Sequence, residues 1–181
     1  SGGAVTGDPE PLVHGTLMAG FAQACINLNI VAGPGAAELL ADLDVERWYP
    51  LRRWFALEQM IGATYQHIDP IRLKLGIEMM SLWYHRGPGH DIIRRGADFL
   101  HFQTGSTGII SVIRGPRELV GSFDLREFDA AAGRAVIHST TPFHRKIESG
   151  VLIGGLLAPG DLDYVDVHND GDPDLLVVEF H

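Results

Sequence analysis

Cysteine is nearly missing from this sequence, which holds a single one, Cys25, in 181 residues. One cysteine excludes an internal disulfide framework and a cysteine-rich zinc site. Cys25 falls on the apolar face of a predicted helix with no base or cation beside it in sequence. We therefore expect a small buried hydrophobe rather than a reactive thiol. This usage fits a reducing cytoplasm, although a secreted protein poor in cysteine would look the same.

Basic residues and long apolar runs are also scarce. The chain has 14 Lys and Arg against 23 Asp and Glu, a net charge of −9. That balance argues against a nucleic-acid-binding surface, which needs a basic patch. No run approaches the roughly 20 apolar residues of a membrane span. With 45% hydrophobic residues, we expect a soluble globular protein that binds neither nucleic acid nor membrane.

The chain suits one domain. Residues 1–8 are small and rich in glycine with no basic start, so we expect residues 1–11 to be a linker or a cloning remnant. Residues 12–181 are long enough to bury roughly two thirds of their unfolded surface in a single core. No internal repeat or second linker interrupts them.

Apolar spacing changes its period along the chain. It predicts helices over residues 12–30, 36–41, 50–66, 69–85 and 91–104. Strand-like runs follow over residues 108–114, 118–128, 134–139, 163–167 and 175–180, with a helix over 143–157. The last run alternates poorly, so we expect that strand deep in a sheet with a helix over at least one face. The prediction is an α+β fold, with an N-terminal helical half followed by a mostly antiparallel sheet carrying a packed helix.

Motifs for catalysis are not found. The nearest candidate is the hydroxyl run 139–141 beside His138 and His144. No nucleophile elbow or glycine loop accompanies it. We therefore expect no catalytic residue and no enzyme activity.

Nine histidines raise the question of a metal or haem site. His85 and His90 flank a Gly-Pro-Gly turn, and no His-Glu-x-x-His or Cys-x-x-Cys element exists, so we expect no metal site. The acidic run 166–174 is similar to a calcium loop but lacks the closing glutamate, and a hairpin turn explains it. His101 follows an apolar helical stripe, where it could be a proximal haem ligand or an ordinary hydrogen-bonded histidine.

Aromatic residues concentrate before the predicted sheet. Aromatics on several helices that face a sheet are first of all core. They could also line an apolar pocket at the helix–sheet junction, with Tyr, Trp and His supplying a few polar contacts. The residues expected at such a ligand pocket are Phe21, Trp54, Phe55, Tyr65, Trp83, His85, Phe99, His101 and Phe102.

Two segments carry a resemblance to known families. Residues 169–180, an Asn-Asp-Gly-Asp-Pro-Asp turn and a strand ending in Glu-Phe, resemble the closing hairpin of 4-vinyl-reductase-type domains. The run Trp48-Tyr49-Pro50-Leu51 is similar to a Trp/Tyr-Pro-Leu segment of a related bacterial family of unknown function. The resemblance implies the fold shared by haem-based nitric-oxide sensors and vesicle-tethering subunits. It also implies a small-molecule sensor or protein-interaction module, usually dimeric.

This sequence lacks the cofactor-binding residues of these relatives. Some 4-vinyl-reductase-type domains bind zinc, and the corresponding positions lie near Thr141, Tyr164, Val167 and Leu175, none of which is such a ligand. The haem sensors hold the propionates with a Tyr-x-Ser-x-Arg element, which this sequence lacks. The hypothesis is thus a cytoplasmic, non-catalytic signalling domain that senses a small apolar or aromatic ligand without a cofactor. We expect it to form a homodimer. The alternatives are a dimeric scaffold without ligand and a haem-binding gas sensor.

Overall fold

The computed structural model describes residues 9–30 and 33–181. Its helices are α1 Gly15–Asn27, α2 Gly33–Asp42, α3 Leu51–Gly62, α4 Asp69–His85, α5 Gly89–Ile92, α6 Gly96–Thr104, the 3-10 helix η1 Ile109–Val112, α7 Arg117–Val120 and α8 Arg145–Leu157. Its strands are β1 Leu12–His14, β2 Trp48–Pro50, β3 Ile113–Arg114, β4 Phe123–Asp129, β5 Arg134–Ser139, β6 Val165–His168 and β7 Leu175–Phe180.

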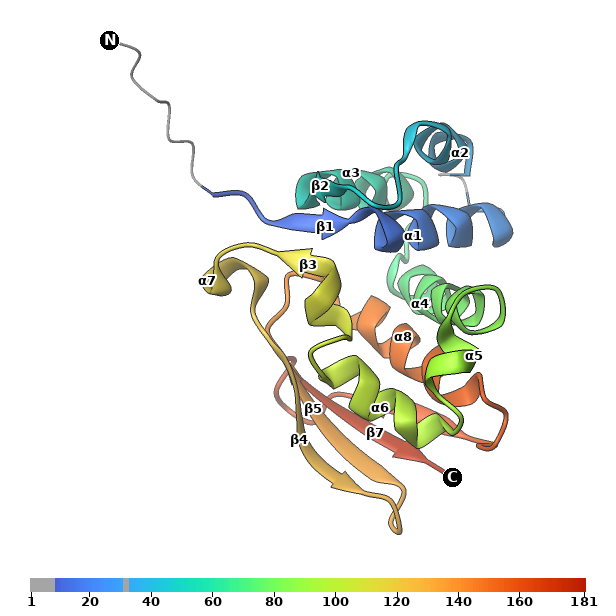
Figure 1. Ribbon diagram of the computed structural model, residues 1–181, viewed down its shortest axis with the longest axis vertical. Helices are drawn as coiled ribbons and strands as arrows, with labels where there is room; N and C mark the ends of the chain where they lie inside the picture. The colour runs from blue at the N-terminus through green and yellow to red at the C-terminus, as the bar shows by residue number, and fades with distance from the viewer. Residues whose placement is uncertain (1–8, 31–32) are drawn as a thin grey trace.

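The predicted α+β fold is confirmed. A helical N-terminal part precedes an antiparallel four-stranded sheet of order β4-β5-β7-β6. In Figure 1, α6 and α8 lie over one face of this sheet, and α4, α1 and then α2 and α3 follow as further layers. Strand β7 lies inside the sheet, and its Leu176 and Val178 are fully buried, as the poorly alternating run predicted.

A close contact between α4 and α8 joins the two halves of the fold. Both helices carry glycine at their crossing, Gly76 on α4 and Gly150 on α8. A Cβ at Gly76 would collide with the carbonyl oxygen of Ile147, and one at Gly150 with that of Leu73. Glycine is therefore needed at both positions for the backbones to approach this closely.

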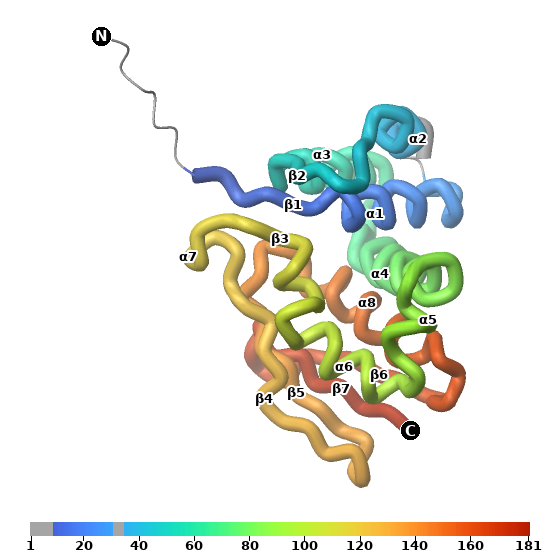
Figure 2. Tube along the Cα trace, viewed as in Figure 1, coloured from blue at the N-terminus to red at the C-terminus, as the bar shows by residue number. Residues whose placement is uncertain are grey.

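The N-terminal segment differs from its prediction. Residues 12–30 do not form one helix, because β1 precedes α1 and pairs antiparallel with both β2 and β3. The resulting three-stranded sheet, β2-β1-β3, joins segments that lie far apart in the sequence. Figure 2 shows this sheet where the N-terminal strand meets the chain between α6 and β4.

Segments before the main sheet also differ from prediction. The strand expected over 108–114 is mostly η1, and the one expected over 118–128 begins as α7 and becomes β4 after Gly121, whose φ is 63°. The helix expected over 91–104 is two, α5 and α6. The carboxylate of Asp98 accepts hydrogen bonds from the backbone N–H groups of Arg94 and Arg95, which starts a new helix at that point.

None of the described helices has both the length and the apolar character needed to cross a bilayer.

Candidate functional site

A groove with a volume of about 610 Å³ lies between α1 and the pair α4 and α6. Its apolar lining includes Leu17, Met79, Met80, Trp83, Phe102 and Ile109. Ligand pockets in proteins usually have volumes of about 300–1,000 Å³ and a mostly apolar lining with few polar groups. The groove therefore has the size and the chemistry of a small-molecule site.

Helix α1 leaves room for this groove at two small residues. Ala19 and Gly20 line the groove from α1. A Cβ placed on Gly20 would meet no atom within 4 Å, so the space beside this residue is open. A larger residue at this position would reach into the groove.

Trp83 and Phe102 form the aromatic wall of the groove. Trp83 lies near the end of α4 and Phe102 on α6, and both are half-buried. Their rings stack with centroids 5.1 Å apart and planes 27° apart. Gly87 and Pro88, which follow α4 directly, also line the groove. Pro88 cannot extend the helix, so the chain turns at this end of the groove.

Few polar groups face the groove. Arg86 is its one charged lining residue among those described, and it forms no ion pair with the described acidic residues. Gln103, on α6, is 8% exposed and its side chain makes no hydrogen bond to a described residue. Together with Thr16, Gln23 and Thr107, these groups could orient a ligand whose body is apolar.

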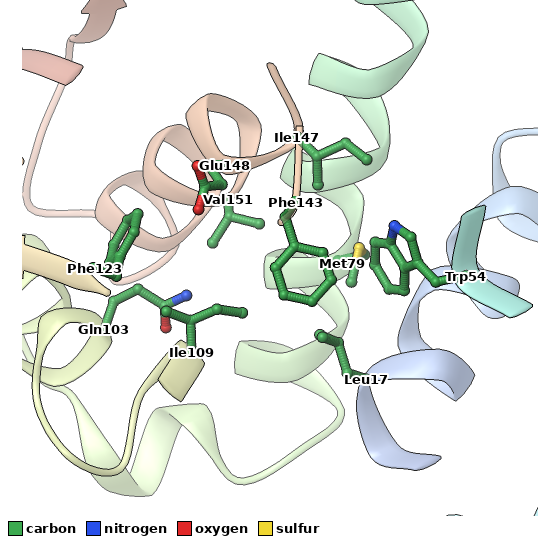
Figure 3. Close-up of a pocket in the computed structure, with 10 residues that line it drawn as sticks. All are labelled: Leu17, Trp54, Met79, Gln103, Ile109, Phe123, Phe143, Ile147, Glu148 and Val151. Carbon is green, nitrogen blue, oxygen red and sulfur yellow. The ribbon is translucent and has the colours of Figure 1, made fainter. Parts of the chain in front are cut away.

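A second, small cavity of about 20 Å³ lies beside the groove (Figure 3). Four residues line both the groove and the small cavity: Leu17, Met79, Gln103 and Ile109. Trp54, Phe123, Phe143 and Glu148 are among the residues that line the small cavity from its other sides. This volume suits about one water molecule, so the helix–sheet junction, where the sequence predicted a pocket, is mostly packed core.

Glu148 is a buried carboxylate at the edge of the small cavity. Both of its oxygens accept hydrogen bonds, from the hydroxyl of Ser139 at 2.8 and 2.9 Å and from that of Thr141 at 2.8 Å. The guanidinium of Arg145 donates a further bond at 2.8 Å and also contacts Asp174 at 3.3 Å. Burial raises the pKa of Glu148, and Arg145 and the two hydroxyls oppose part of that rise.

A second buried carboxylate, Glu58 on α3, anchors Trp54. The indole Nε1 of Trp54 donates to Glu58 Oε1 at 3.3 Å, and Arg72 Nη2 lies 3.8 Å from Glu58 Oε2. Burial raises the pKa of Glu58, and Arg72 lowers it in part. Trp54 also stacks on Phe21 at 4.2 Å, so this group holds α1, α3 and α4 together.

The predicted pocket residues lie in three environments. Trp83 and Phe102 line the groove. Phe21, Trp54 and Phe99 are fully buried core, and Phe55 and Tyr65 pack against that core. His85 and His101 are exposed.

Sequence reasoning missed Met79, Met80, Arg86 and Gln103 as groove residues. Gln103 could have been found, because Gly96, Phe99, Leu100 and Gln103 follow the 0, 3, 4, 7 spacing of a buried helix face and all four are buried. A glutamine at such a position is unusual. His101 falls off this face, and its ring packs edge-on against Phe128 at 4.6 Å.

The groove lining does not fit haem. Haem iron is held in proteins by His, Cys or Tyr, or by Met together with His. None of the described residues that line the groove is His, Cys or Tyr. Met79 and Met80 offer only thioethers, and Arg86 is the single cation available for two propionates.

The candidate catalytic residues are bound to other groups. The hydroxyls of Ser139 and Thr141 donate to Glu148, and the Nδ1 of His144 accepts from the backbone N–H of Lys146 at the start of α8. On the outer face of the sheet, Asp166, His168 and Glu179 have potential ligand atoms within 4.8 Å of one another.

That surface group already has an internal contact, 2.8 Å between His168 Nδ1 and Asp166 Oδ2. Asp166 is partly exposed and His168 and Glu179 are exposed, and exposed acidic groups of this kind are common without an ion. We therefore assign it no metal.

Comparison with known proteins identifies the fold. No family model matches the sequence, and no curated protein matches it, so the 4-vinyl-reductase-type resemblance has no family match behind it. Among the solved structures that are similar to this chain, two share 12% identity with it over 92% of its length. One is a variant of Tt H-NOX, with a TM-score of 0.63 over 94% of that chain. The other is a protein studied for the modulation of haem redox potential through porphyrin distortion, with a TM-score of 0.60 over 99% of that chain. The chain therefore has an H-NOX-like α+β fold, as expected from the haem-sensor relatives.

Proposed function

We propose that this protein is a non-catalytic sensor domain that binds a small apolar or aromatic molecule in the groove between α1, α4 and α6. The observation that carries the proposal is the groove itself, with its volume of about 610 Å³ and its stacked Trp83–Phe102 wall. The H-NOX-like fold supports the sensor role, since folds of this type serve mostly as sensors rather than enzymes.

The position of the groove suits signalling. A bound molecule would contact α1 in the N-terminal helical part and α6, which packs on α8 and β4. A ligand shifts a conformational equilibrium only when it binds one arrangement better than another. A molecule that touches both layers favours the arrangement of the layers that it binds better, which would couple occupancy of the groove to the packing of α6 on the sheet.

A thermal-shift screen tests the proposal. We expect a member of a panel of small aromatics, fatty acids and tetrapyrroles to raise the melting temperature, because a ligand at 100 times its Kd stabilises the folded state by about 2.7 kcal/mol. The variant Gly20→Phe fills the groove from α1 and should lose this shift. Ala56→Phe, an aromatic added at an exposed position of α3 away from the groove, is the matched control and should retain it.

The absence of a shift across the panel would contradict the proposal. A shift that persists in Gly20→Phe would place the ligand elsewhere.

A haem-binding gas sensor is the second candidate, favoured by the likeness to Tt H-NOX. The groove lining argues against it, so haem added to the purified protein should give no stoichiometric Soret band. A stoichiometric band that His101→Ala abolishes would favour the haem function instead.

The dimeric scaffold remains a separate prediction. Light scattering on the purified protein decides whether it is a homodimer. A dimer that neither panel ligands nor Gly20→Phe affect would support the scaffold over the sensor.

A further inference from the structure

Gln103 is a buried polar side chain for which the fold supplies no partner. It is 8% exposed, lies on the buried face of α6, and borders both the groove and the small cavity. Its amide makes no hydrogen bond to the described residues. Figure 3 shows the amide among Ile109, Phe123 and the other side chains that line the small cavity.

Packing of α6 does not require a glutamine at this position. Large apolar residues, Phe99 and Leu100, occupy two of the other buried positions on the same face of α6, and a methionine or leucine would complete it. Buried polar groups in native proteins are nearly always hydrogen-bonded, to protein or to ordered water, and the Gln103 amide, without a partner among the described residues, is free to pair with water or with a molecule in the groove. The amide of Gln103 is also accessible to solvent. Among the described side chains, the one polar atom that is fully enclosed and has no hydrogen-bond partner is Arg72 Nε.

The surroundings of Gln103 select against an anionic ligand group. The carboxylate of Glu148 borders the same small cavity, with its oxygens occupied by Ser139, Thr141 and Arg145. A ligand carboxylate at this point would find no cation to pair with, because no Lys or Arg lines the small cavity among the described residues and Arg145 is already paired with Glu148 and Asp174. The amide itself offers both N–H donors and a carbonyl acceptor, and a neutral partner with one donor and one acceptor uses both.

We propose that Gln103 is the polar recognition residue of the groove, and that the ligand is an uncharged apolar molecule with an adjacent hydrogen-bond donor and acceptor, as in a carboxamide, lactam or cyclic imide. This inference rests on the proposed function of the groove. The apolar body of the molecule packs against the Trp83–Phe102 wall, and its amide-like edge pairs with Gln103.

Three probes that share one bicyclic body test the inference: 2-naphthamide, naphthalene and 2-naphthoate. Calorimetric titration of the full chain should show that 2-naphthamide binds about 10-fold or more tightly than the other two, the difference expected for a paired polar edge. In Gln103→Met, which keeps the size of the side chain, this preference should disappear while naphthalene binding stays within about 3-fold. The free Gln103→Met protein should melt at or above the wild-type temperature, because an unpartnered amide has been removed.

The outcomes separate the two proposals. If all three probes bind equally well and Gly20→Phe abolishes them, the groove is a ligand site and the role of Gln103 is wrong. If 2-naphthamide keeps its preference in Gln103→Met, that role is also wrong. If no probe binds the wild type, the inference fails, and the thermal-shift panel decides the function of the groove independently. Should Gln103→Met fold poorly, the amide has a structural partner and the inference is overturned, which Gln103→Leu checks independently.

Discussion

Trp54 and Trp83 lie on successive helices, α3 and α4, and the structure gives them different energetic roles. The side chain of Trp54 is 1% exposed, and it stacks on Phe21 at 4.2 Å and meets Phe143 edge-on at 5.1 Å. Trp83 is half-buried, and part of its ring lines the groove. Truncation to alanine should therefore affect the two positions unequally.

The expected cost follows from the buried area. A fully buried aromatic removes about 150–250 Å² from water, which at about 25 cal/mol per Å² corresponds to about 4–6 kcal/mol. Alanine keeps a methyl group and the cavity relaxes in part, so Trp54→Ala should lower the free energy of unfolding by about 3–5 kcal/mol. It also removes the indole N–H that donates to Glu58. Trp83→Ala removes a side chain that is already partly in the groove, and should cost about 1–2 kcal/mol.

Urea unfolding followed by far-ultraviolet circular dichroism measures both changes, since the fluorescence of the missing tryptophans is not needed. The slope of free energy against urea should stay at the wild-type value, which shows that the unfolded state is unaffected. Trp83→Ala should lose binding of any groove ligand, whereas Trp54→Phe should keep it. The reasoning is refuted if Trp83→Ala costs as much as Trp54→Ala, or if Trp54→Ala costs less than about 1 kcal/mol.

The remaining predictions concern glycine packing and pH. Gly150→Ala should destabilise the protein by about 1–3 kcal/mol or more, because the added Cβ would meet the carbonyl of Leu73. Gly20→Ala, in open space within α1, should stabilise it by about 0.5–1 kcal/mol. Urea unfolding of both variants measures this difference. Burial raises the pKa of Glu58 and Glu148, so the folded state holds these protons more tightly than the unfolded state. Their contribution to stability is thus fully present below the unfolded value of 4.5 and is lost as pH rises through the raised folded pKa. The difference in unfolding free energy between wild type and Glu58→Gln/Glu148→Gln should therefore shift against the wild type as pH rises, and a difference independent of pH would contradict this.

Local sequence patterns were sufficient to predict those helices and strands whose ends are set by adjacent residues. Helix α4 matches its prediction from residue 69 to 85, because Asp69-Pro70 starts it and the Gly87-Pro88 turn ends it. The buried strand β7 and the tight turn before it were likewise predicted from short runs. Trp83 was predicted from an apolar stripe in the same way, whereas Phe102 was predicted from the clustering of aromatic residues before the sheet.

Contacts between distant segments were decided only by the tertiary structure. Strand β1 exists because Leu12 and Val13 pair with β2 and β3, and nothing in their own neighbourhood distinguishes them from the start of a helix. The groove, too, depends on which helices meet: α1 has no side chain at Gly20, and the chain turns at Pro88, just after α4. Periodicity shows which face of a helix is buried, but not what that face is buried against. For that reason the sequence determined the class of fold and placed aromatic residues on these helices, whereas the packing of α1 against α4 and α6 determined where the groove lies and placed Gln103 beside it.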